Sequence, residues 1–84
     1  MSLQCLRKLG VKVDASNLSK YCPHNATHWV GLDVHDCTSV NFDTILHKGH
    51  VFSIEPGIYF PHDSDCPDDL RGTGIRSEDT VILE

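Results

Sequence analysis

Hydrophobic positions along the chain predict a short N-terminal helix followed by mostly antiparallel strands. In residues 2–10, leucines recur at helical spacing, Ser2 can cap the first turn and Gly10 can end the last. Further along, runs rich in β-branched and aromatic residues predict strands. The predicted strands cover residues 27–34, 50–55, 58–60 and 73–84.

The segments between these elements are polar or rich in turn residues. Residues 11–22 and 37–47 are expected to be connectors, and residues 61–72 form a predicted acidic, exposed loop with two prolines. Pro56 and Gly57 suit the second and third positions of a turn, so we expect a turn between the two neighbouring strands.

Side-chain alternation assigns the two faces of the second predicted strand. Val51, Ser53 and Glu55 share one face, and Phe52 and Ile54 share the other. We expect the apolar pair Phe52 and Ile54 to face the core. Glu55 precedes a proline, which favours an extended backbone, and we expect it to point away from the apolar layer.

Composition narrows the possible functions. The chain has 84 residues, a hydrophobic content of 39% and a formal charge of -5, which fits one small domain or a piece of a larger one. The acidic balance argues against nucleic-acid binding, which needs a basic face. No apolar run approaches the roughly 20 residues that span a bilayer, and no signal peptide is visible. Four cysteines without a CxxC pair are expected to be free thiols.

Half of the six histidines lie in one short stretch, PHNATHWVGLDVHD, at residues 23–36. Together with two carboxylates further along, His28, Glu55 and Glu78 form a hard, oxygen-rich ligand set that suits manganese, cobalt or zinc. Taken one at a time, the same carboxylates also fit a solvated strand, in which Arg76 and Glu78 form a surface ion pair of little energetic value.

Three motifs in order, PHNATHWVGLDVHD, SIEPGIYF and GIRSED, resemble the C-terminal half of a Xaa-Pro aminopeptidase. The resemblance covers residues 20–84. It is nearest to the aminopeptidase P branch of the pita-bread metallopeptidases, close to the mitochondrial intermediate-cleaving peptidases. The implied fold class is α+β: the C-terminal half of a pita-bread domain over residues 1–84, with a curved antiparallel sheet and a short N-terminal helix.

The resemblance also implies roles for individual side chains. The implied metal ligands are His28, Glu55 and Glu78. The implied catalytic residues that are not ligands are His24, His35 and Arg76. In this family the two histidines hold the substrate and stabilise the tetrahedral intermediate, and the arginine lies close to the metal site.

The implied activity is that of a metalloaminopeptidase, which removes an N-terminal residue, typically before proline, with a hydroxide shared by two divalent ions. The implied ions are manganese, and the implied partner is a peptide with proline at its second position, with neither nucleic acid nor membrane. The expected compartment is mitochondrial or cytoplasmic, without a visible targeting signal.

The chain departs from the family pattern in two ways. Asn25, His50 and Ser77 stand at peripheral positions where the family usually has other residues. The larger departure concerns two upstream aspartate ligands, since Asp14 is the only acidic residue before the motifs. The chain therefore looks like a fragment with three of five protein ligands, which we expect to be inactive alone.

Two alternatives stay open. A non-catalytic half-domain would pair with another half-domain or a paralogue and would show an exposed apolar face. A small structural zinc module would use the Cys and His side chains of residues 22–37, although their spacing matches no common zinc pattern. The candidate zinc ligands of this module are Cys22, His24, His28, His35 and Cys37.

The peptidase hypothesis makes a geometric demand. The ligand atoms of His28, Glu55 and Glu78 should lie within about 7 Å of one another, because two metals in such sites are about 3.5–4 Å apart. His24 and His35 should flank that cluster without entering it as ligands.

Overall fold

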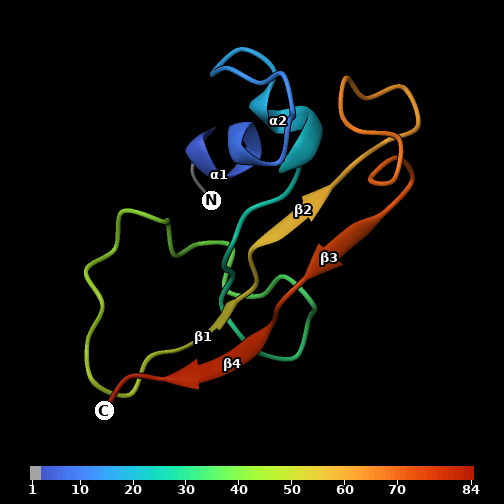
Figure 1. Cartoon of the computed structure of the whole chain (residues 1–84). Coiled ribbons are helices and arrows are strands. Elements are labelled where there is room, and N and C mark those ends of the chain that lie inside the picture. The colour runs from blue at the N-terminus through green and yellow to red at the C-terminus, as the bar shows by residue number, and fades with distance from the viewer. Residues whose placement is uncertain (1–2) are drawn as a thin grey trace.

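A computed structural model describes residues 3–84, which form two short helices and two small antiparallel sheets. Figure 1 shows the helices at one end of the molecule, and the strands form a ribbon that runs from there towards the C-terminus. The elements are α1 (Leu3–Lys8), α2 (Leu18–Tyr21), β1 (Val51–Ile54), β2 (Gly57–Tyr59), β3 (Gly74–Arg76) and β4 (Asp79–Ile82).

The helix α1 forms where the leucine spacing predicts it. It ends before Gly10, whose φ of 83° lies in the left-handed region that glycine adopts without a steric penalty. The predicted cap at Ser2 lies outside the described residues. The helix α2 was not expected, because its four residues are too few to show a helical period and Asn17 makes no side-chain cap.

The two sheets continue one another in a single register. β1 pairs with β4, with Ile54 opposite Asp79, and β2 pairs with β3, with Gly57 opposite Arg76. Continuing the register of either sheet across the gap places Glu55 opposite Glu78 and Pro56 opposite Ser77. The strands therefore form one long antiparallel ribbon with an interruption in its middle (Figure 1).

The interruption lies where Glu55 and Pro56 stand opposite Glu78 and Ser77. The Ser77 amide still donates to the Pro56 carbonyl at 3.1 Å. Proline has no N–H to donate in return, which breaks the ladder at this point. The predicted turn at Pro56 was wrong: the chain runs straight on from β1 into β2, and the proline interrupts the pairing without reversing the chain.

A third extended segment, residues 26–30, pairs with the free edge of β1. The Ser53 amide donates to the His28 carbonyl at 2.8 Å, and the Glu55 amide donates to the Ala26 carbonyl at 2.7 Å. Trp29 forms an antiparallel bridge with Phe52. The predicted strand at residues 27–34 is therefore extended only in its first half, and residues 31–35 turn away.

The hydrophobic core lies at the helical end of the molecule. Its buried residues are Leu6, Val11, Val13, Tyr21, Ile58, Phe60 and Cys66. No two of the four cysteines form a disulfide.

The expectation that Phe52 and Ile54 face the core was wrong. Ser53 of β1 and Glu55, which directly follows β1, are buried at 1% and 8% exposure, whereas Ile54 is 47% exposed. The polar face is buried because segment 26–30 and its hydrogen bonds cover Ser53. Phe52 contacts the Trp29 ring, at 6.2 Å between ring centroids, and does not reach the core.

The molecule is elongated and exposes many large apolar side chains. Its radius of gyration is 15.4 Å, compared with about 12 Å for a compact domain of this length. The described residues contain no helix that is both long enough and apolar enough to cross a membrane. The large exposed apolar side chains include Leu32, Val34, Phe42, Ile45, Leu46, Ile54, Ile75 and Ile82.

Stability should depend strongly on Leu6, which is fully buried in the core. Leu6→Ala should lower the free energy of unfolding in urea by about 2–5 kcal/mol, because it removes buried methyl groups and leaves a cavity. Leu9→Ala is the matched control, since Leu9 is 49% exposed, and it should change that free energy by less than about 0.5 kcal/mol. Equal losses in both variants would contradict the location of the core.

Candidate metal and peptide site

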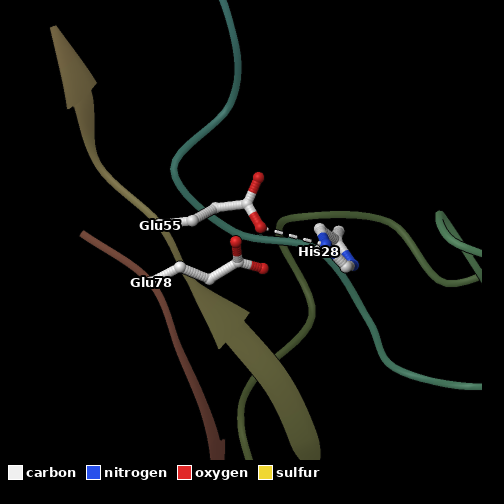
Figure 2. Close-up of side chains that lie close together, drawn as sticks. All are labelled: His28, Glu55 and Glu78. Carbon is white, nitrogen blue, oxygen red and sulfur yellow. Dashed lines mark ion pairs between the residues drawn. The ribbon is translucent and has the colours of Figure 1, made fainter. Parts of the chain in front are cut away.

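His28, Glu55 and Glu78 converge on one point. One ligand atom from each side chain can be chosen so that all three lie within 4.8 Å of one another. Figure 2 shows both carboxylates directed towards the imidazole. The geometric demand of about 7 Å is therefore met, although the role of these side chains as ligands stays a prediction.

The register of the ribbon explains this convergence. Glu55 and Glu78 stand directly opposite each other, so their side chains leave the same face. His28 pairs with Ser53, one step along that face. The Ser53 hydroxyl accepts a hydrogen bond from the His28 amide at 3.0 Å, and the Thr27 hydroxyl donates to the Ser53 carbonyl at 2.6 Å. Ser53 thus fixes the backbone that carries the imidazole.

The hydrogen bonds of His28 leave the correct nitrogen for a metal. Its Nδ1 lies 3.0 Å from the Trp29 carbonyl oxygen, which can only accept, so Nδ1 carries a hydrogen. In the neutral ring, Nε2 then presents a lone pair towards the Glu55 carboxylate, 3.1 Å away. Two lone-pair donors this close require a proton or a cation between them. Histidine ligands of metals commonly have this kind of backbone partner.

The charges of the facing carboxylates of Glu55 and Glu78 also favour a bound cation. Like charges directly opposite on neighbouring strands destabilise a sheet. Burial favours the neutral form of Glu55, but hydrogen bonds with Ser53 and Glu78, and the charges of His28 and Arg76, outweigh it and hold the pKa of Glu55 below its usual value. A largely buried, ionised carboxylate beside a second carboxylate and an imidazole nitrogen fits a divalent cation.

A directional hydrogen-bond chain lies beside this cluster. The Arg76 Nε donates to the Tyr59 hydroxyl at 2.9 Å. His24 Nδ1 donates to the Asn25 carbonyl at 2.8 Å, so the unprotonated Nε2 of the neutral ring accepts from the Tyr59 hydroxyl, also at 2.8 Å. The hydrogen bond to Tyr59 raises the pKa of Arg76 above its usual value, and its guanidinium therefore stays charged.

Two glycines make room for this chain. A Cβ at Gly57 would lie 2.5 Å from the His24 Nε2 and 2.6 Å from the Tyr59 hydroxyl, and a Cβ at Gly74 would lie 2.5 Å from the Tyr59 ring. Larger residues at either position would displace Tyr59 or His24.

His35 differs from His24 in having free ring nitrogens. Its ring packs edge-on against His28, with 5.0 Å between ring centroids. The ring is exposed, and within residues 3–84 its nitrogens make no hydrogen bond. A pocket of about 640 Å³ is lined by all three histidines of the motif together with Glu55. His35 therefore presents a donor to anything bound in this pocket.

Tyr59 and Ser53 are the two residues of this site that the sequence did not single out. Alternation from Glu55 places Tyr59 on the same face only because the chain runs straight through Pro56, where a turn was expected. Alternation also places Ser53 on the face of Glu55, but the role of Ser53 depends on pairing with the distant segment 26–30. No cysteine joins a group of three possible ligands anywhere in the described chain, so the structure does not support the zinc module.

Tyr59→Phe should lower the free energy of unfolding and remove the hydrogen bond between the Tyr59 hydroxyl and His24 Nε2. The variant removes two hydrogen bonds, each worth about 0.5–1.5 kcal/mol. Nitrogen-15 NMR should show a shift of the His24 Nε2 resonance, because Nε2 no longer accepts a hydrogen bond from Tyr59, whereas the bond from Nδ1 to Asn25 keeps the same tautomer. The matched control is Tyr21→Phe, because the Tyr21 hydroxyl makes no hydrogen bond in the described residues, and it should leave the His24 signals unchanged. An unchanged Nε2 resonance of His24 in Tyr59→Phe would contradict the hydrogen-bond chain from Arg76 through Tyr59 to His24.

Comparison with known proteins agrees with this geometry. Residues 2–84 match the model of metallopeptidase family M24. The chain is 40% identical over 78 residues to the mitochondrial intermediate cleaving peptidase 55 of Arabidopsis thaliana, with 93% of this chain and 16% of that protein covered. It is 48% identical over 65 residues to human Xaa-Pro aminopeptidase 3, with 76% of this chain and 13% of that protein covered.

A solved structure is also similar. The crystal structure of Icp55 from Saccharomyces cerevisiae superposes with a TM-score of 0.82 at 41% identity, over 96% of this chain and 21% of that chain. The helices and the ribbon are thus part of a pita-bread domain. The chain belongs to metallopeptidase family M24, and it resembles the Xaa-Pro aminopeptidases and intermediate-cleaving peptidases of that family. It spans about a sixth of the length of the plant relative.

Proposed function

We propose that this chain supplies part of the active site of a metalloaminopeptidase that removes the N-terminal residue of peptides with proline at the second position. The observation that carries the proposal is the convergence of His28, Glu55 and Glu78 on one point of an M24 ribbon. The names of the similar proteins support the substrate class, and the name of the plant relative supports a mitochondrial location, with the cytoplasm as the alternative.

The proposed ligands would hold divalent cations, for which we propose manganese and a count of two. When bound, the ions would lower the pKa of the attacking water and polarise the scissile carbonyl. One imidazole nitrogen and two carboxylates provide the mostly oxygen ligand set that manganese accepts. The backbone bond from His28 Nδ1 to Trp29 keeps Nε2 free for coordination.

The remaining side chains divide the work around the peptide. His35, with free nitrogens, would donate to the oxyanion that develops on the scissile carbonyl. His24 is engaged at both nitrogens, so we propose that it orients Tyr59 and the charged Arg76 beside the two glutamates. Glu55 would accept a proton at a carboxylate oxygen and deliver it to the leaving nitrogen.

A chimera tests this function. In the chimera, residues 3–84 would replace the matching segment of the yeast protein. The structural match between the two includes 96% of this chain. We expect manganese-dependent release of the N-terminal residue from Xaa-Pro peptides by the chimera. We expect no release by the chain alone, since three side chains leave much of two coordination spheres unfilled. An inactive but folded chimera, or an active isolated chain, would contradict the proposal.

A second candidate function is that of a non-catalytic half-domain, and the many exposed apolar side chains favour it. Burying such a surface would stabilise association with a complementary part of an M24 domain. Gel filtration of the chain mixed with the complementary segment of the yeast protein should give a joint peak, whether or not the mixture is active.

A further inference from the structure

The loop that carries His35 is closed at its base. Trp29 and Asp36 form an antiparallel bridge, and residues 31–35 turn between them. This loop is exposed and contributes nothing to the hydrophobic core. Some other interaction must therefore hold the loop in the one conformation that places the His35 ring against His28.

The Asp36 carboxylate is the group that holds the loop together. Its Oδ1 accepts from the Cys37 amide at 2.8 Å, and its Oδ2 accepts from the Asp33 amide at 3.4 Å. These backbone bonds, with a further contribution from the Leu32 amide, hold the pKa of Asp36 below its usual value. One side chain thus gathers backbone N–H groups from both sides of His35.

Gly31 leaves the space that this carboxylate occupies. A Cβ at residue 31 would overlap the Oδ2 and Cγ atoms of the Asp36 carboxylate. The φ of Gly31 lies outside the left-handed region, so the requirement for glycine here comes from the close approach of Asp36 and not from backbone strain. Gly31 and Asp36 therefore form a matched pair within the loop.

We propose that Asp36 is a positioning residue for His35: its carboxylate, seated over Gly31, folds residues 31–37 so that the His35 ring stands against His28 in the pocket. The functional importance of this positioning rests on the proposed peptidase function. The positioning itself is independent of any metal or substrate, and it can be measured on the chain as it exists.

The experiment measures the nuclear Overhauser effect between the ring protons of His28 and His35 in the labelled full chain. Asp36→Ala should abolish this signal while the amide shifts of β1 and β4 remain. Asp36→Asn is isosteric and keeps one acceptor oxygen, so it should fold and retain a reduced signal, with faster exchange of the Asp33 amide. Gly31→Ala should reduce the signal in the same way, because it displaces the carboxylate.

The matched control is Asp33→Asn, which removes one negative charge from the same loop. Within residues 3–84 the Asp33 carboxylate makes no hydrogen bond or ion pair, so the ring signal should be unchanged. An unchanged His28–His35 signal in Asp36→Asn and Gly31→Ala would overturn the proposal, whether or not Asp36→Ala folds. Equal loss in Asp33→Asn would also overturn it, since charge alone would then explain the effect.

Added manganese separates this inference from the proposed function. In the wild-type chain, a bound paramagnetic ion should broaden the ring signals of both His28 and His35. In Asp36→Ala it should broaden His28 but spare His35. If manganese broadens neither ring in any variant, the metal site fails, while the ring-to-ring signal still decides the role of Asp36.

Discussion

Glu78→Gln should remove divalent cation binding from the chain and peptidase activity from the yeast chimera. The substitution keeps the size of the side chain but removes the charge of one of only two carboxylates in the cluster. We expect manganese affinity to fall by more than about 100-fold, because even groups that only orient a metal ligand are worth roughly 10- to 100-fold. Isothermal titration on the chain and Xaa-Pro hydrolysis by the chimera measure the two effects.

Asp79→Asn is the control for this result. Asp79 is the next residue along the same exposed strand, and alternation directs its side chain to the opposite face of the ribbon. Asp79→Asn removes one negative charge at the neighbouring position. Its manganese affinity and the activity of its chimera should nevertheless stay close to those of the parent. Similar losses of affinity and activity in both variants would show that Glu78 acts only through the general surface charge.

His35→Ala should lower kcat of the chimera by about 100- to 1,000-fold, the usual effect of removing one donor to a developing oxyanion. The KM should change much less, because the donor acts mainly on charge that appears in the transition state. Cation affinity of the isolated chain should be unaltered, since His35 contacts the His28 ring without joining the ligand group. Steady-state kinetics and titration separate these quantities.

His62→Ala provides the control for this prediction, because His62 is an exposed histidine in the acidic loop. It should leave both kcat and KM unchanged. A His35 variant that loses cation affinity in proportion to kcat would contradict the oxyanion role and would indicate that His35 is itself a ligand.

Much of the fold followed from local sequence signals. Leucine spacing and Gly10 identified α1, and the β-branched run identified β1. Alternation correctly grouped Ser53 with Glu55, but it cannot say which of two faces is buried. That choice depends on segment 26–30, which lies more than twenty residues away in the sequence and covers the polar face.

Pro56 illustrates a second limit. A proline followed by glycine suits a turn and also suits a break in a ladder, and the residues themselves do not distinguish the two. Only the shared register of the two sheets shows that the chain continues straight, with Glu55 opposite Glu78. The convergence of His28, Glu55 and Glu78 was expected from their residue types and from the family resemblance, whereas the place of Tyr59 between Arg76 and His24 needed three-dimensional contacts.

The shared register has a consequence for how such a chain can vary in length. The pairing that sets Glu55 opposite Glu78 is independent of the number of residues in the loop between β2 and β3. An insertion between the exposed Asp68 and Asp69 should leave the carboxylates in place, so this loop can accept an epitope tag or natural length variation. A single residue inserted between Pro56 and Tyr59 would instead exchange the two faces of β2. Tolerated insertions and deletions should therefore concentrate in the acidic loop and avoid the short stretch around the proline.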